Sequence, residues 1–316
     1  MTAAENQPTW PSIPYVEWRD TLETLQLWTQ IVGKIRLAQT PWVNHAWHSA
    51  LHVSARGLTT SLISLPGGGM EIEFDFVDHR LTLSTTGGGR ASVPLVPQTV
   101  GAFYAAVMAA VRSVGVDVEI NRMPNEVAEP IPFHDDDRHH TYDGDAAHRF
   151  WLATLQSDRV FKLFRTRFTG KCSPVHFFWG SFDLAVTRFS GRTAPPHPGG
   201  VPNLPDAVAR EAYSHEVSSA GFWPGGGPID YPAFYSYAYP EPPGYRDAPL
   251  RPEGAFFDEG MGEFILPYDL VRTAGDPDGV LLEFLQATYE AAAVQGAWDR
   301  TALEVPTGDI GRPRTI

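Results

Sequence analysis

The sequence GKCSPVHFFWGSFDLAVTRFSGR, residues 170–192, is the stretch around which the rest of the chain is organised. It contains the only cysteine, a histidine among aromatic residues and an aspartate inside an apolar run. Successive side chains of a strand point to opposite faces. One continuous strand would therefore place His176 and Arg188 together among apolar residues, and Trp179 and Asp183 together on the other, more polar face.

A fainter relative of this stretch lies earlier in the chain. A predicted helix and a Gly-Lys pair precede both stretches, and four residues then recur in register without a gap. The matched residues are Val43 and Val175, Trp47 and Trp179, Ser49 and Ser181, and Arg56 and Arg188. We infer an α+β fold of two similar α-β-β-β-β-α halves, an internal duplication with antiparallel sheets and with long Pro/Gly loops in the second half.

Apolar spacing predicts the individual elements, because a period of three to four indicates a helix and strict alternation indicates a strand. Helices are predicted over residues 18–32, 100–114, 146–164 and 278–294, and strands over 34–38, 43–54, 70–76, 80–84, 116–120, 213–223, 234–239 and 262–266. The first helix is expected to stop at Gly33. The predicted units are a tail (1–14), a first half (15–122), an acidic, histidine-rich connection (123–145), a second half (146–300) and a tail (301–316).

Composition narrows the class of protein. The 316 residues carry a net charge of −13, and no run of Lys and Arg is present, which argues against nucleic-acid partners. No apolar run approaches the roughly 18 residues that span a bilayer, the first residues lack the pattern of a signal peptide, and a single cysteine fits a reducing compartment. We expect a cytoplasmic monomer or homodimer with a small-molecule ligand and no membrane partner.

Six stretches of the chain resemble the DUF5996 family, a bacterial family of unknown function found mainly in actinobacteria. They are WPSIPYVEWRDTLETLQLWTQIVGKIRLA (10–38), EFDFVDHRL (73–81), GKCSPVHFFWGSFDLAVTRFSGR (170–192), EAYSHEVSSAGFWPGG (211–226), FYSYAYPEP (234–242) and EFILPYDLVRTAGDPD (263–278). Together they cover most of the chain, and the long central motif is specific. The resemblance implies no activity, so the hypotheses on function rest on the residues themselves.

Four residues are candidates for catalysis: His176, Asp183, His215 and Glu216. A histidine inside an aromatic strand can act as an acid, a base or a metal ligand, and the structural alternative is a hydrogen-bonded core histidine. His215 and Glu216 would point to opposite faces of a strand, so they could share one site only in a loop. Among the early histidines of residues 45–52, a single member facing the pocket is expected.

Cationic and aromatic residues are candidates for substrate binding. Arg188, Arg192 and Lys171 could hold an anionic group, because a guanidinium binds a carboxylate or phosphate with two parallel hydrogen bonds. A structural Arg–carboxylate pair in the core is the alternative for Arg188. The residues expected to line an aromatic pocket are Trp179, Phe177, Trp223, Tyr235 and Tyr237.

The connection includes FHDDDRHHTYD, residues 133–143, which is rich in carboxylates and imidazoles. These groups are metal ligands, and Asp137 and His140 are the better candidates in this segment. Together with His176 and His215 they would bind one divalent metal. No spacing matches a known metal motif, so a solvated acidic loop is the alternative.

Three hypotheses on function follow. The first is an enzyme whose His/Asp/Glu/Arg pocket, with or without a metal, acts on a small anionic or aromatic substrate. Polar residues inside apolar strands favour it, because burying them needs a reason. The second is a non-catalytic binding protein with an aromatic-lined pocket. The third is a role in assembly, in which the aromatic loops of residues 220–245 form a homodimer contact.

Overall fold

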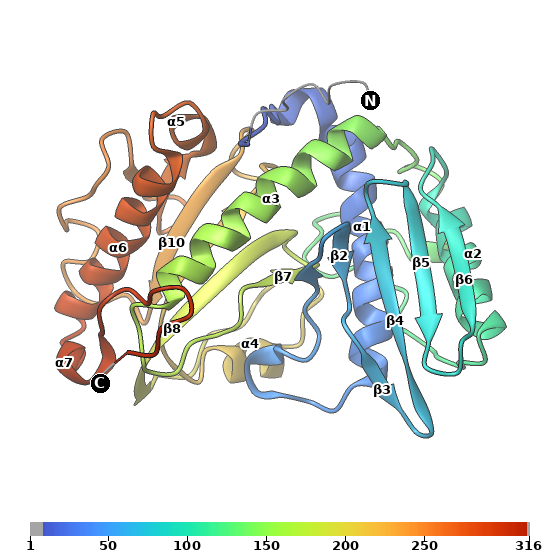
Figure 1. Cartoon of the computed structure of the whole chain (residues 1–316), viewed down its shortest axis with the longest axis horizontal. Coiled ribbons are helices and arrows are strands. Elements are labelled where there is room, and N and C mark those ends of the chain that lie inside the picture. The colour runs from blue at the N-terminus through green and yellow to red at the C-terminus, as the bar shows by residue number, and fades with distance from the viewer. Residues whose placement is uncertain (1–8, 315–316) are drawn as a thin grey trace.

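Two antiparallel six-stranded sheets and the helices that cover them make up the protein (Figure 1). The structure is a computed structural model and describes residues 9–314. The strand order is β1-β2-β4-β5-β6 with β3 beside β4 in the first sheet, and β11-β12-β10-β9-β8-β7 in the second. The predicted α+β class with antiparallel sheets is confirmed.

The first half runs from helix α1 (Tyr15–Gln39) to helix α2 (Val100–Ser113). Between them lie the 3-10 helix η1 (Asn44–Ala46) and strands β1 (His52–Val53), β2 (Gly57–Thr59), β3 (Ile63–Leu65), β4 (Gly68–Asp75), β5 (Arg80–Thr85) and β6 (Arg90–Pro94). Alternation in β4 buries Met70, Ile72 and Phe74 on the face that α1 and α2 cover. The polar face of this sheet is turned to solvent.

The second half follows the short 3-10 helix η2 (Phe133–Asp135) and begins with helix α3 (Gly144–Arg165). Its strands are β7 (His176–Phe178), β8 (Asp183–Thr193), β9 (His215–Trp223), β10 (Ala233–Tyr239), β11 (Phe256–Asp258) and β12 (Glu263–Pro267). Its further helices are α4 (Asp206–Ala212), α5 (Tyr268–Arg272), α6 (Pro277–Gln295) and α7 (Arg300–Leu303). Helices α3 and α6 cover the apolar face of the sheet (Figure 1).

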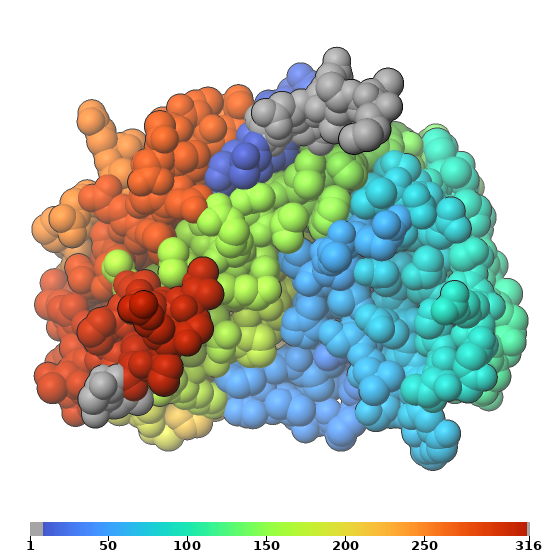
Figure 2. Space-filling model, in the orientation of Figure 1, coloured from blue at the N-terminus to red at the C-terminus, as the bar shows by residue number. Residues whose placement is uncertain are grey.

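The two sheets meet edge to edge. Leu51, just before β1, and Phe177 of β7 exchange two backbone hydrogen bonds of 2.9 and 2.7 Å. Both side chains belong to one apolar core that continues through the two halves. On the face shown in Figure 2, α3 runs along the boundary and the atoms of the two halves meet closely.

Helix α1 is longer than predicted. It continues through Gly33 and Lys34 to Gln39, so the predicted stop at Gly33 and the predicted strand over 34–38 are wrong. The physical reason is packing: a Cβ atom on Gly33 would lie 2.2 Å from the indole of Trp179. The glycine allows a close approach between helix and hairpin and does not end the helix.

The long strand predicted over residues 43–54 is also wrong. His45 and Ala46 adopt positive φ angles of 61° and 56°. The backbone N–H of His45 donates to the Glu211 carboxylate (2.8 Å), which holds this segment against α4. Residues 116–120, predicted as a strand, have no regular structure and pass along the wall of the cavity described below.

The other predicted helices and the strands of residues 70–76, 80–84, 213–223, 234–239 and 262–266 correspond closely to observed elements. The order helix, sheet, helix occurs twice. Trp47 and Trp179 both lie in turns and not in strands as predicted. The internal duplication stays a prediction. Residues 1–8 of the predicted tail lie outside the described residues, whereas Trp10 and Ile13 are buried in the core.

Within residues 9–314, no helix has the length and apolar character needed to cross a membrane.

Candidate functional site

A cavity of about 1310 Å³ lies on the polar face of the second sheet. Strands β7 to β10 and the start of β12 form its floor, while α1, residues 119–129 and residues 201–213 contribute to its walls. Carboxyl, phenol and indole groups dominate the lining. They belong to Glu126, Asp183, Glu263, Tyr213, Tyr235, Tyr237, Trp47, Trp179 and Trp223.

The floor depends on a hairpin that the sequence did not reveal. The predicted continuous strand ends at Phe178, residues 179–182 form a turn with Phe182 at a φ of 62°, and β8 then begins at Asp183. Phe178 pairs with Asp183 and His176 pairs with Ala185. His176 and Asp183 therefore share the cavity face. The prediction that they lie on opposite faces is wrong, because the turn changes the parity of the side chains.

Two side-chain hydrogen bonds fix the carboxylate of Asp183 in the floor of the cavity. Ser181 Oγ donates to one of its carboxylate oxygens and Tyr235 OH donates to the other. Tyr235 reaches β8 because it crosses Gly221 on the strand between them: a Cβ atom there would lie 2.3 Å from the phenol oxygen. Burial raises the pKa of Asp183, although the hydrogen bonds from Ser181 and Tyr235 act in the opposite direction.

Glu126 enters the cavity from the loop between α2 and α3. Gln30 of α1 binds both backbone groups of the preceding residue, Asn125, with hydrogen bonds of 2.8 and 2.9 Å. Glu126 has a φ of 58°, an uncommon conformation for a residue with a side chain. Its carboxylate rests on Gly180, where a Cβ atom would lie 2.0 Å from Glu126 Oε1. The loop is thus held so that Glu126 faces Asp183.

Two of the cavity carboxyl groups titrate near neutrality. Burial, followed by the charge of Asp183, raises the pKa of Glu126 to about 7. Glu126 lines the cavity, and the residue as a whole is exposed to solvent. Burial and the charges of Asp183 and Asp258 also raise the pKa of Glu263 to about 7. Both effects disfavour the charged form.

Lys34 and His45 are the basic groups of the opposite wall. Burial lowers the pKa of Lys34 to about 8, and its amine donates to Asn125 Oδ1. Burial likewise lowers the pKa of His45. His45 Nδ1 donates to the carbonyl of Ala212 (2.8 Å), so that Nε2 accepts from the amine of Lys171.

His176 lies at the end of the cavity next to Trp47, with 6.5 Å between the ring centroids. Its side chain is fully buried, and neither ring nitrogen has a hydrogen-bond partner in the described part of the chain. Burial, followed by the charges of His52 and Arg165, lowers the pKa of His176 to about 3. The ring is therefore neutral at physiological pH and offers one donor and one acceptor.

Aromatic side chains complete the enclosure. Trp179 Nε1 donates to the carbonyl of Ser49 (2.9 Å), which leaves the face of the indole as its contact surface. Tyr213 and Tyr237 join their hydroxyl groups at 2.7 Å. Burial raises the pKa of Tyr213 to about 12, so this phenol keeps its proton. Three of the predicted binding residues, Trp179, Trp223 and Tyr237, do line the cavity.

Arg188 and Arg192, predicted to bind an anionic group, lie outside the cavity. Arg188 points to the opposite face of the sheet, where its guanidinium stacks 3.5 Å from the centroid of Phe164. Arg192 pairs with Glu216 at 2.6 Å and donates to the carbonyls of Gly296 and Ala297, just after α6. Glu216 is thus a structural ion-pair partner of Arg192.

The other predicted residues also lie apart. His215, at the start of β9, contacts Ser214 at 3.1 Å and does not line the cavity. Lys171 lies behind His45. Asp137 and His140 are exposed in their loop. These side chains do not converge with His176, and among the residues that the structure describes no group of three or more His, Cys, Asp or Glu could hold a metal ion.

Sequence reasoning did not single out Glu126, Glu263 or Lys34. Glu263 carried a usable signal, since it alternates with Ile265 in a strand whose other members are apolar. Glu126 carried none, because it lies in a proline-rich loop without periodicity. Lys34 was assigned to a short strand, and its place on the buried face of α1 became visible only with the full length of the helix.

Residues 10–305 match the profile of DUF5996, described as a family of unknown function. The chain therefore belongs to the DUF5996 family, as the resemblance of its motifs implied. No curated protein and no solved structure gives a significant match.

Proposed function

We propose that this protein is an enzyme that transfers protons to and from a small molecule bound in the cavity. The observation that carries the proposal is the presence of two enclosed carboxyl groups, Glu126 and Glu263, whose pKa values are raised to about 7. A general acid or base works best when its pKa is close to the working pH. Perturbed carboxyl groups in a cleft are typical of active sites.

The surrounding residues have supporting roles in this proposal. Asp183 is fixed by Ser181 and Tyr235, and its charge helps to keep its neighbours protonated. The pKa of Tyr235 is raised well above its usual value by burial and by Asp183, so Tyr235 acts as a hydrogen-bond donor. His176 supplies a neutral imidazole at the far end of the floor.

The substrate class changes relative to the sequence-based hypothesis. Indole and phenol faces support an aromatic or apolar substrate, as expected. An anionic substrate loses its expected partners, because Arg188 and Arg192 lie outside the cavity. A divalent metal likewise has no converging ligand set among the described residues.

A non-catalytic binding protein is the second candidate. The observation that favours it is the density of aromatic groups in a cavity large enough for a small organic molecule. In that case the carboxyl groups would position the ligand without transferring protons. We also retain a cytoplasmic location and a small-molecule partner as proposals, on the basis of the lone cysteine and the acidic composition.

The test compares the parent protein with Glu263→Gln in a mixture of small metabolites, followed by mass spectrometry. The parent is expected to convert at least one compound, and the variant to do so about 10²- to 10⁴-fold more slowly, the range for loss of an acid–base group. Glu73→Gln, on the open face of the first sheet, is the matched control. Compounds that bind without conversion would support the binding protein, and full activity of Glu263→Gln would refute the catalytic role.

A further inference from the structure

We propose that the cavity binds a small organic cation, an amine or a guanidine attached to an apolar or aromatic body. The inference rests on the proposed function in that it names the ligand class of the same cavity. It is carried by three features: carboxyl groups without a cationic partner, a buried imidazole without any partner, and aromatic walls.

The first feature is the uncompensated acidity of the floor. None of the ion pairs among residues 9–314 involves Glu126, Asp183 or Glu263. Enclosed carboxylates are costly unless a positive charge compensates them. A cationic ligand would provide that charge.

Two basic residues that line the cavity are paired with carboxylates of the wall. Arg138 lies 3.7 Å from Glu129, and His139 lies 2.8 Å from Asp136. The amine of Lys34 donates to the neutral amide oxygen of Asn125 and keeps its charge. Glu126, Asp183 and Glu263 therefore share the cavity with one lysine, and the three carboxyl groups outnumber it.

The second feature, His176, is independent of the carboxyl groups. Its imidazole is fully buried, it lines the cavity, and both of its nitrogens lack a partner within the described structure. A buried polar group is normally hydrogen-bonded. Because a neutral imidazole has one acceptor nitrogen, an N–H group of an ammonium or guanidinium ion would satisfy it once the ring turns that nitrogen toward the cavity, since both nitrogens are buried as they stand.

The third feature is the aromatic lining. The rings of Trp223 and Tyr237 border the cavity. Trp47 and Trp179 border it too, and lysine amines of the chain already lie 5.5 and 5.8 Å from their ring centroids. The face of an aromatic ring attracts a cation, most strongly when both are shielded from water. The same rings would also bury the apolar body of the ligand, so one molecule could use both properties.

The register of the strands sets the size of the ligand. His176 lies opposite Ala185, and Asp183 is two residues from Ala185 on the same face. Such positions are about 7 Å apart. An aminomethyl or guanidino group on a ring or short chain spans this distance, so a ligand of that size could contact both groups together.

The experiment measures binding of three ligands of equal size and different charge by calorimetry: benzylamine, benzyl alcohol and benzoate. Benzylamine is expected to bind about tenfold more tightly than benzyl alcohol, and benzoate most weakly, since charge complementarity discriminates between partners. Benzyl alcohol or benzoate binding as tightly as benzylamine would overturn the inference, and so would the absence of benzylamine binding.

Variants locate the site. Glu263→Gln and Glu126→Gln should each weaken benzylamine binding about tenfold while leaving benzyl alcohol unchanged, because only the charged contact is lost. Glu73→Gln should alter neither. Thermal unfolding of each variant checks that it is folded, and two variants keep the test decisive if one of them is not. Equal loss for benzylamine and benzyl alcohol would contradict a charge-specific contact.

The outcome is separable from that of the catalytic proposal, since binding is measured without turnover. Benzylamine binding with the expected selectivity, combined with no conversion in the metabolite mixture, would refute catalysis and leave the cation inference standing. Conversion of a neutral or anionic metabolite, without amine binding, would support catalysis and refute the cation inference. Displacement of benzylamine by magnesium ions alone would assign the carboxyl groups to an inorganic cation and overturn the inference.

Discussion

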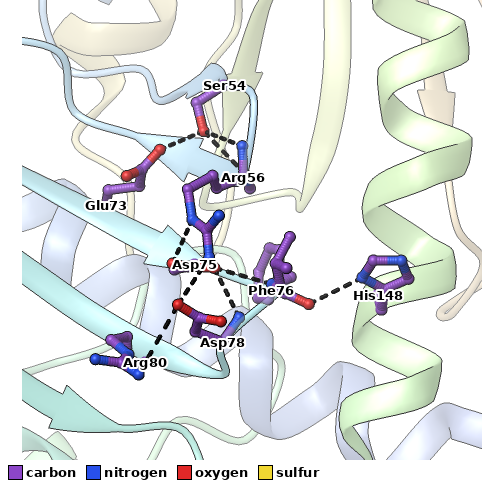
Figure 3. Close-up of polar contacts among 10 residues, drawn as sticks. Ser54, Arg56, Glu73, Asp75, Phe76, Asp78, Arg80 and His148 are labelled. Atoms are coloured by element: carbon purple, nitrogen blue, oxygen red, sulfur yellow. Dashed lines mark hydrogen bonds and ion pairs between the residues drawn. The ribbon is translucent and has the colours of Figure 1, made fainter. Parts of the chain in front are cut away.

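Asp75 and Asp183 lie on the polar faces of the two sheets and are almost equally buried, with 4% and 5% of their surface exposed, yet their pKa values move in opposite directions. Burial raises the pKa of Asp75, but hydrogen bonds from Arg56 and from the backbone N–H groups of Asp78 and Val77 outweigh it (Figure 3). Asp183 has only neutral donors, and burial keeps its pKa raised.

This difference separates the roles of the two halves. On the polar face of the first sheet, Arg56 bridges Asp75 at 2.6 Å and Asp78 at 2.9 Å (Figure 3). The polar face of the second sheet is enclosed by loops and carries carboxyl groups without such a partner. In the first sheet the buried aspartate has an arginine partner from its own chain, whereas in the second sheet a ligand could supply the missing positive charge.

The largest expected effect is on the stability of the first half. Gly57 lies so close to β4 that a Cβ atom would approach the Phe74 carbonyl to 1.8 Å. A backbone atom cannot give way easily, so Gly57→Ala should lower the free energy of unfolding by about 3 kcal/mol. Urea unfolding measures this. The clash at Gly221 is only with a side chain, so Gly221→Ala should lose less free energy of unfolding than Gly57→Ala. The opposite order would contradict this difference between the two halves.

The next effect is a pH dependence that belongs to the second half. The pKa of Glu263 is about 7 in the folded protein, against 4.5 normally. Because the folded state disfavours the ionised form, the contribution of Glu263 to the free energy of unfolding falls as the pH rises from about 4.5 to 7. Glu263→Gln removes this loss. The variant should gain stability relative to the parent across that range, by at most about 3 kcal/mol.

Unfolding of both proteins in urea at pH 4.5, 6 and 7.5 tests the sign. Glu73→Gln, on the open face, should show no comparable trend. A difference between Glu263→Gln and the parent that stays constant with pH would mean that Glu263 is not in the low-hydration environment that the cavity provides.

A smaller cost in stability is expected at Gly221, with a large effect on the site. Gly221→Ala forces the Tyr235 phenol away from Asp183, and we expect a loss of about 1 to 2 kcal/mol together with loss of ligand binding. Tyr235→Phe removes the same hydrogen bond without adding volume. If Gly221→Ala bound benzylamine like the parent, Tyr235 would not be needed to organise the floor.

The smallest effect concerns the exposed arginines of the first half. Arg56→Gln should raise the pKa of Asp75, since its main cationic partner is lost. Ionised Asp75 adds to the free energy of unfolding at pH values above its normal pKa of 3.8, and this stabilisation is lost as the pH falls through its lower folded pKa. In acid, the stability of Arg56→Gln should therefore resemble that of the parent. NMR titration of Asp75 measures the shift.

Arg80→Gln is the control for Arg56→Gln, since Arg80 lies 3.8 Å from Asp78 on the surface and does not contact Asp75. Equal shifts of the Asp75 pKa in both variants would show that general surface charge, and not the Arg56 hydrogen bond, distinguishes Asp75 from Asp183.

Local patterns predicted much of the fold and little of the site. The alternation of Met70, Ile72 and Phe74 and the spacing of apolar residues in α3 and α6 depend on neighbours along the chain, so they were visible in the sequence. The turn at residues 179–182 decides which face of the sheet carries His176, and no glycine-rich motif marks this turn in the sequence. The meeting of Glu126 with Asp183 is set by tertiary contacts through Gln30 and Gly180.

The contact between Gly33 and Trp179 has a consequence for how the protein is made. The helix that walls the cavity is synthesised before the indole that packs against it, because Gly33 precedes Trp179 in the sequence. Until then the glycine face of α1 has no indole to cover it, and Leu51 has no Phe177 to pair with. The cavity therefore completes late in biosynthesis, and a fragment that stops before residue 170 would expose an apolar seam for chaperones to bind.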